Sequence, residues 1–172
     1  MESPKVPPIS IENAKILFRN FSGKEGKFNA KGLRNFCVLL EDDLAQKLIK
    51  DGWNVRWLEP NAKYEERRAY LQVKVRFDKF PPRIMLIKSK GKSRLDEENV
   101  HILDWAEFET VNLIISGYSW DVSGKTGIKA YLKRMYATLV EDEFEKLYEN
   151  VPDSAQSALL DQDDDEELPF DL

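Results

Sequence analysis

Residues 68–77 read RAYLQVKVRF, with apolar and polar side chains at alternating positions. Successive side chains of a β-strand point to opposite faces of the sheet, so this stretch predicts a strand with one face in the core and one in solvent. The predicted core face comprises Leu71, Val73, Val75 and Phe77, and the outward face comprises Tyr70, Gln72, Lys74 and Arg76.

Short apolar or alternating runs recur on both sides of this strand, separated by turn residues. They predict further strands with one to three short helices between them. Many short strands and few helices favour an all-β chain, an OB-fold-like small β-barrel, over an alternating parallel βαβ domain. Strands are expected at 9–21, 35–40, 53–58, 83–90, 111–122 and 128–140, and helices at 42–51, 96–108 and 141–150.

Two of these elements carry more detailed expectations. In the strand at 9–21, Ile16 and Phe18 alternate toward one side, with an irregularity near Asn13. In the first helix, Asp42 or Asp43 is the expected cap and Gly52 the expected end. Its buried face is expected to comprise Leu44, Leu48 and Ile49.

The net charge of −5 averages two different parts of the chain. Residues 1–140 hold 25 basic and 18 acidic side chains, whereas residues 141–172 hold one basic and thirteen acidic side chains. A basic body with an acidic end indicates a polyanionic ligand for the body and a separate task for the end. We expect a flexible N-terminal arm at 1–8, one folded domain at 9–150 and a disordered acidic tail at 151–172.

Basic residues concentrate at 67–94, which hold ten Lys or Arg and one acid, Asp78. Single-stranded nucleic acid is bound by cations that contact phosphates and by flat rings that stack on unpaired bases. The plainer alternative is a solvated outer face of a sheet, with the rings in ordinary cross-strand packing. Where cations and aromatic residues mix, the candidate DNA-binding residues are Lys27, Phe28, Arg34, Tyr70, Lys74, Arg76, Lys88, Lys90, Tyr118, Trp120, Lys125, Lys129, Tyr131 and Lys133.

Several classes of protein are disfavoured by what the chain contains. One Cys and one His exclude an internal disulfide and a Cys/His zinc site, and they supply no nucleophile–base pair. No signal-peptide core and no run of eighteen apolar residues is present, so we expect a cytoplasmic protein without a membrane contact. We expect no cofactor and no metal. Asp96, Glu97, Glu98 and Asp104 leave open a magnesium-dependent nuclease, although acids at the start of a short helix are the commoner arrangement.

The last twelve residues read DQDDDEELPFDL and combine seven acids with a small apolar tip. Such a tip is typical of a docking motif, in which a ring enters a partner's pocket and the acids meet a basic rim. A tethered polyanion also competes with DNA for a basic groove on the same chain. The predicted partner-docking residues are Leu168, Pro169 and Phe170.

This ending resembles the acidic tip of bacterial and phage single-stranded-DNA-binding proteins, from which Asp171 and Leu172 depart because the bacterial proteins end at the Phe. The segments GKFNAKGLRNFCVLL, DGWNVRWL, AYLQVKV and TGIKAYLKRMYATL resemble an OB-fold family of single-stranded-DNA-binding proteins encoded by phages and prophages.

The resemblance implies a non-enzymatic, sequence-independent binder of single-stranded DNA. It would act in phage DNA replication, recombination or repair and recruit the proteins of those processes through its tail. Two alternatives remain from the residues alone: the metal-dependent nuclease, and an interaction module whose acidic tail mimics DNA. The oligomeric state is left open.

Overall fold

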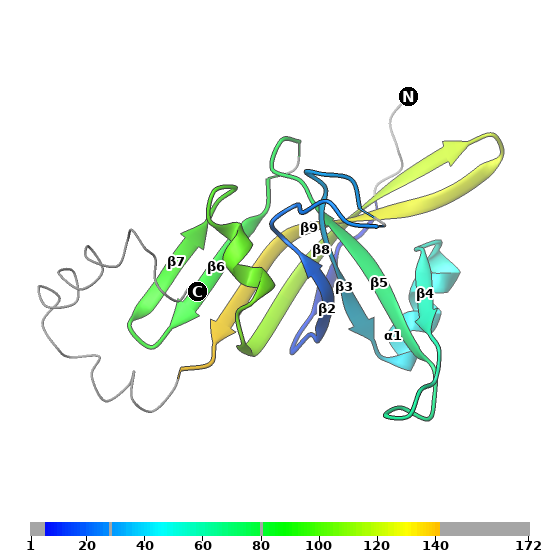
Figure 1. Ribbon diagram of the computed structural model, residues 1–172. Helices are drawn as coiled ribbons and strands as arrows, with labels where there is room; N and C mark the ends of the chain where they lie inside the picture. The colour runs from blue at the N-terminus through cyan, green and yellow to red at the C-terminus, as the bar shows by residue number, and fades with distance from the viewer. Residues whose placement is uncertain (1–5, 28, 80, 142–172) are drawn as a thin grey trace, which may run out of the picture. The chain divides into compact units, whose positions relative to one another are not determined.

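The computed structural model describes residues 6–27, 29–79 and 81–141, and these are mostly β-structure (Figure 1). The prediction of an all-β chain is confirmed. The strands are β1 (Ile9–Ile11), β2 (Ile16–Asn20), β3 (Arg34–Leu40), β4 (Val55–Leu58), β5 (Arg68–Val75), β6 (Arg83–Lys88), β7 (Gly91–Leu95), β8 (Phe108–Val122) and β9 (Lys125–Leu139). One α-helix, α1 (Asp42–Asp51), and one 3₁₀ helix, η1 (Val100–Asp104), complete the elements.

The strands form a single sheet in the order β1-β8-β9-β5-β3-β2. β4 is added beside β5, and the β6–β7 hairpin joins through β6 to β9. The pairings of β9 with β5 and with β6 are parallel, and the other strand pairs are antiparallel. Figure 1 shows the β6–β7 hairpin on one side of β9 and β5, β3 and β2 on the other.

The two ends of this path, β1 and β2, are consecutive segments of the chain. Between them the Ala14 amide donates to the Val111 carbonyl on β8 at 2.7 Å, and the Lys15 carbonyl accepts from the Leu39 amide on β3 at 2.9 Å. Residues 9–20 therefore span from β8 to β3 and bring the sheet round on itself. A partly open barrel of this kind is the OB-fold arrangement, and the prediction of an OB-fold-like barrel is confirmed.

The core lies inside this curved sheet and follows the predicted alternation. On β5 the side chains of Ala69, Leu71, Val73 and Val75 are buried, and the residues between them are half-buried or exposed. On β3 the buried set includes Phe36, whose ring stacks on that of Phe21 with centroids 5.1 Å apart. Removing such a fully buried side chain, as in Leu71→Ala, costs about 2–5 kcal/mol of stability because a cavity remains.

The N-terminal strand differs from its prediction in one respect. The expected irregularity near Asn13 is present, since Asn13 has a φ of 51° and divides the strand into β1 and β2. Phe18, however, does not point to the core beside Ile16: it has a φ of 50°, lies in a bulge of the pairing with β3, and is 62% exposed. The bulge shifts the side-chain direction, so strict alternation was the wrong rule there.

The first helix forms where expected and ends at Gly52, whose φ of 102° is the left-handed geometry that glycine adopts without steric cost. Its N-cap is Glu41, not Asp42 or Asp43, and Glu41 makes no side-chain cap bond. Both aspartates lie in the first turn, where their charge complements the helix dipole. The buried residues are Ala45 and Leu48, whereas Ile49 is 43% exposed.

Three further expectations are corrected or completed. The strand expected at 83–90 is a hairpin, because the chain reverses before Gly91 and continues as β7. The helix expected at 96–108 is reduced to η1. The turn between β8 and β9 comprises Ser123 and Gly124, whose φ angles of 52° and 82° match a two-residue hairpin turn of type I′.

The chain divides into two units after Val140. The helix expected at 141–150 and the domain boundary expected at 150 lie outside the described residues, as do the N-terminal arm up to Lys5 and the acidic tail. Among the residues that the structure describes, no helix is long and apolar enough to cross a membrane.

Candidate nucleic-acid interface

The outward face of β5 lies in the middle of a continuous polar surface. Residues paired directly across neighbouring strands project from the same side of a sheet. Lys74 pairs with Asn35 on β3 and with Tyr131 on β9, and Tyr70 pairs with Leu39 on β3 and Arg56 on β4. Side chains from four strands therefore meet on one face.

Two hollows open on this face, one on either side of Gln72 and Lys74, and both residues line each hollow. The first has a volume of about 610 Å³ and lies toward the loop between β2 and β3. The second has a volume of about 480 Å³ and lies toward the β8–β9 hairpin. We call the two together the β5 groove. It is further lined by Asn29, Gly32, Leu33, Arg34, Asn35, Val75, Arg76, Phe77, Asp78 and Glu97 in the first hollow, and by Gly52, Trp53, Asn54, Arg56, Leu71, Trp120, Thr126, Gly127, Ile128, Lys129 and Ala130 in the second.

Two of the five cations in the β5 groove are held by carboxylates. Arg34 lies 3.2 Å from Glu97, and its Nε also donates to the Phe21 carbonyl at 2.9 Å. Arg76 binds Asp78 through two hydrogen bonds, at 3.1 and 2.7 Å. The hydrogen bond from Arg76 holds the pKa of Asp78 below its usual value, and the same bond raises the pKa of Arg76.

The other three cations are Arg56, Lys74 and Lys129. Within the described ranges, the ion pairs are the two just given, so these three side chains have no carboxylate within 4.0 Å. All three are exposed. Unneutralised cations on both sides of a groove make it attractive to a polyanion.

Exposed aromatic rings border the same face. Phe18 lies edge-on to Tyr70, with ring centroids 6.3 Å apart. Tyr118 lies edge-on to Tyr131, with centroids 5.5 Å apart, and is 39% exposed. Rings fixed by such contacts and open to solvent are suited to stack on unpaired bases.

The indole of Trp120 forms part of the second hollow and is positioned by a glycine. Trp120 pairs with Gly127 across the β8–β9 hairpin, and a Cβ at that glycine would lie 2.7 Å from the indole ring. Only a residue without a side chain leaves room for the ring at this position. Gly117 makes the same room for the buried ring of Trp53.

The single cysteine lies on the β3 side of the β5 groove. Cys37 pairs with Gln72 and is buried. Burial raises the pKa of the Cys37 thiol to about 11, although the nearby Arg56 guanidinium acts in the opposite direction. The thiol is therefore uncharged at neutral pH and a poor nucleophile.

The structure brings together about half of the described candidate residues. Tyr70, Lys74, Tyr118 and Tyr131 lie on the shared face, and Arg34, Arg76, Trp120 and Lys129 line the β5 groove. Lys27, Lys125 and Lys133 are exposed on the β2–β3 loop, at the hairpin tip and beside an irregularity of β9. Lys88 and Lys90 lie at the turn between β6 and β7, away from both hollows. Phe28 and Leu168, Pro169 and Phe170 are outside the described residues.

Sequence reasoning missed Phe18 and Arg56. Phe18 had no detectable signal, because its exposure follows from a bulge and a positive φ. Arg56 stands between Val55 and Trp57, so alternation along β4 was sufficient to place it on the outward face.

Three of the four acids that left a nuclease open are engaged in the fold, Glu97 by its ion pair with Arg34. Asp104 accepts from the amides of Phe21 and Ser22 at 2.6 and 3.2 Å. Asp96 accepts from the amides of Glu98 and Asn99 at 2.9 and 3.2 Å. In the part of the chain that the structure describes, no group of three or more His, Cys, Asp or Glu is placed to hold a metal ion.

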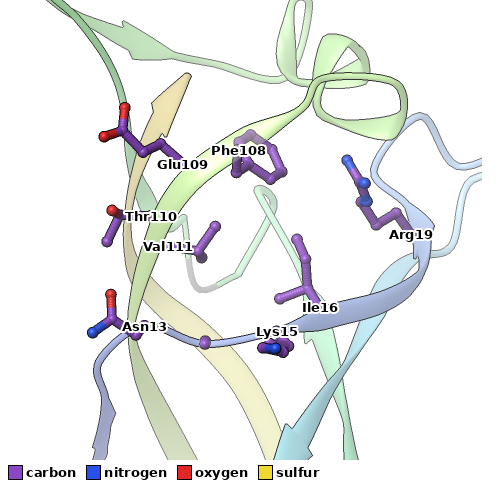
Figure 2. Close-up of a pocket in the computed structure, with 9 residues that line it drawn as sticks. Asn13, Lys15, Ile16, Arg19, Phe108, Glu109, Thr110 and Val111 are labelled. Atoms are coloured by element: carbon purple, nitrogen blue, oxygen red, sulfur yellow. The ribbon is translucent and has the colours of Figure 1, made fainter. Parts of the chain in front are cut away.

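A third hollow, of about 340 Å³, lies between β2 and the start of β8 (Figure 2). Its arginine, Arg19, serves the fold: Nη1 donates to the Leu103 and Ala106 carbonyls at 2.9 and 2.7 Å, and the guanidinium lies 5.1 Å from the Phe108 ring centroid. Glu109 also lines the hollow. Among the described residues that line it, Lys15 is the one further cation, whereas the β5 groove offers Arg56, Lys74 and Lys129 to a polyanion.

Comparison with known proteins supports the fold and identifies the family. Two solved structures share the fold: the C-terminally truncated single-stranded DNA-binding protein of bacteriophage Enc34 (TM-score 0.52, 11% identity, 78% of this chain and 87% of that chain) and the form without that truncation (0.51, 12%, 87% and 89%). No curated protein sequence matches the chain. The family model described as "Putative phage ssDNA-binding domain" matches residues 3–171, and the chain belongs to this family.

Proposed function

We propose that this protein binds single-stranded DNA without regard to sequence and that the β5 groove is where it does so. One observation carries the proposal: the two hollows share Gln72 and Lys74, so a single groove crosses the sheet between unneutralised cations and exposed rings. Membership of the phage ssDNA-binding family supports the choice of ligand.

The roles follow from the chemistry of each side chain. Arg56, Lys74 and Lys129 contact phosphates, and their contacts release counterions, which makes affinity fall with salt. Phe18, Tyr70 and Tyr118 stack on bases, which is possible only where the bases are unpaired. Neither role depends on base identity, and neither breaks a covalent bond, so we propose a non-enzymatic protein.

We further propose that the acidic C-terminal residues recruit proteins of DNA replication, recombination or repair in the bacterial host cytoplasm and compete with DNA. The charges support this division: residues 141–172 hold thirteen acids, whereas residues 1–140 have an excess of seven basic side chains. The tip Leu168, Pro169 and Phe170 supplies the apolar anchor.

The test is a fluorescence titration with oligo-dT and with a duplex of matched length, each at two salt concentrations. Tryptophan emission reports binding, because Trp120 lines the groove. We expect tight binding to the single strand, weak binding to the duplex, and marked weakening by salt. Equal affinity for the two ligands would contradict base stacking and with it the proposed use of the groove.

A further inference from the structure

A second cationic face lies outside the β5 groove, on the outward side of β6, β7 and β9. Arg83 on β6 pairs with Arg134 on β9, and Met85 pairs with both Tyr136 on β9 and Arg94 on β7. Direct partners share one side of a sheet. That side is the outer one, because the intervening residues Ile84, Leu86 and Met135 are core side chains. We call this set, with Lys92, the β6–β9 face; its members are Arg83, Met85, Lys92, Arg94, Arg134 and Tyr136.

Within the described residues, none of its four cations has a carboxylate within 4.0 Å. Arg83, Lys92, Arg94 and Arg134 are all exposed. The ion pairs of the described chain are Arg34–Glu97 and Arg76–Asp78, and both lie elsewhere. Arg83 and Arg134 are moreover directly opposite each other, an arrangement of like charges that destabilises a sheet unless an anion lies between them.

Protection of a sheet edge explains only part of this charge. Lysine and arginine on an edge strand hinder pairing with other chains, and this accounts for Lys92 and Arg94 on β7. It does not account for Arg83 and Arg134. β6 is paired on both sides, by β7 and β9, and β9 is paired with β5, β6 and β8.

The β6–β9 face is continuous with the β5 groove along β9. Tyr131 pairs with Lys74 at the groove, and Tyr136 lies five residues further along the same strand, about 16 Å away at the usual rise of a strand. Between them the register of β9 shifts, leaving Lys133 as an extra exposed cation beside Arg134. Exposed cations therefore continue along β9 from Lys129 in the groove, past the buried ring of Tyr131, to Lys133 and Arg134.

We propose that single-stranded DNA leaving the β5 groove continues over β9 onto the β6–β9 face, where Arg83, Arg94 and Arg134 bind its phosphates. This inference rests on the proposed function. It assigns the protein a longer binding site than the groove alone provides, with the additional part contributing mainly electrostatic affinity.

The experiment measures affinity for oligo-dT over a series of lengths with the full-length protein, for the natural sequence and for Arg83→Ala/Arg94→Ala/Arg134→Ala. We expect equal affinity for the shortest strands that bind and, for the longest, a loss on the order of tenfold or more. The triple variant should also reach its plateau at a shorter length. For long strands its slope of log affinity against log salt should fall by about 2, since each phosphate contact on a single strand contributes about 0.7.

Two controls make the result specific. Replacing the same three residues by lysine keeps the charge and should restore the natural plateau. Lys47→Ala/Lys50→Ala/Lys63→Ala removes three exposed cations that belong to neither surface, and should leave the length dependence unchanged. Thermal melting of the alanine triple variant should show equal or higher stability, because the opposed arginines are gone.

The outcomes separate the two proposals. If the natural protein binds oligo-dT and the alanine triple variant matches it at every length, the β6–β9 face is not a DNA surface and serves another partner, such as an acidic protein. If short and long strands weaken equally, the arginines act within the groove and the extension is wrong. If the natural protein binds no single strand of any length, the proposed function itself fails.

Discussion

Tyr70 and Lys74 lie four residues apart on the outward face of β5, with Gln72 between them, and the proposed function gives them different tasks. Tyr70→Ala removes a ring on which a base stacks, so single-strand affinity should fall by roughly 1–3 kcal/mol with little change in salt dependence. Lys74→Ala removes a phosphate contact and should lower the slope of log affinity against log salt by about 0.7. Titrations at four salt concentrations distinguish the two effects. If both variants stay folded and bind like the natural protein, the site lies elsewhere, and the β8–β9 hairpin is the next candidate.

Asp78 holds Arg76 by two hydrogen bonds at the end of the first hollow. The carboxylate neutralises a cation that DNA would otherwise contact and adds repulsion toward phosphates. Asp78→Asn should therefore tighten single-strand binding and steepen its salt dependence, because Arg76 becomes available. Both side chains are exposed or nearly so, hence the melting temperature should change little. Unchanged affinity in low salt would show that Arg76 does not meet the ligand.

Burial of Cys37 makes stability depend on pH in the alkaline range. The pKa of its thiol is about 11 in the folded chain, against 9.0 for an exposed thiol. Between these values the unfolded chain loses the proton while the folded chain keeps it, so stability falls as pH rises from 9 to 11. The fall due to this group over that range is at most about 2 kcal/mol, because the folded thiol is itself half ionised at pH 11. Urea unfolding at pH 8 and pH 11 should show it in the natural protein and not in Cys37→Ala; the difference between the two proteins removes the titration of tyrosines and lysines.

At the scale of elements, the β8–β9 hairpin positions Trp120 through the absence of a side chain at Gly127. Gly127→Ala places a methyl group 2.7 Å from the indole, so the ring must move. In this variant the wavelength of Trp120 emission should shift toward that of an exposed indole, and single-strand binding should weaken. Gly124→Ala is not a suitable control, because its φ of 82° adds strain. Val122→Ala, at an exposed position of the same hairpin outside the β5 groove, should change neither property.

The elements that sequence predicted well are those with an apolar face. β5 has four buried side chains at every second position, and the pattern identifies both the strand and its outward residues. β7 was missed, because GKSRL has a single buried residue, Leu95, and gains its strand geometry from pairing with β6. A strand that depends on tertiary pairing in this way shows no alternation of apolar and polar residues in its own sequence.

The same reason explains which parts of the site were missed. A face built from four strands is determined by register, and register follows from long-range pairing such as Lys74 with Tyr131. The chain shows the charge of Arg34 but not the carboxylate that holds it, since Glu97 is 63 residues distant. Only the folded protein therefore distinguishes the predicted cations that are paired with carboxylates from those that are available to DNA.

At the scale of the whole molecule, we propose that the acidic C-terminal residues compete with DNA for a body that has an excess of basic residues. Deleting residues 161–172 removes seven acids and changes the net charge from −5 to +2. We expect tighter single-strand binding at low salt and a smaller gain at high salt, because a tethered polyanion is a screened competitor. The melting temperature should stay nearly constant.

Phe170→Ala is the matched control, because it keeps every charge. Its DNA affinity should not change, whereas its capture of replication or recombination proteins from phage-infected lysate should be lost with the apolar anchor. Equal capture by the natural protein and Phe170→Ala would contradict docking by the tip and leave the tail its electrostatic role alone. A deletion that leaves single-strand affinity unchanged at low salt would remove that role too.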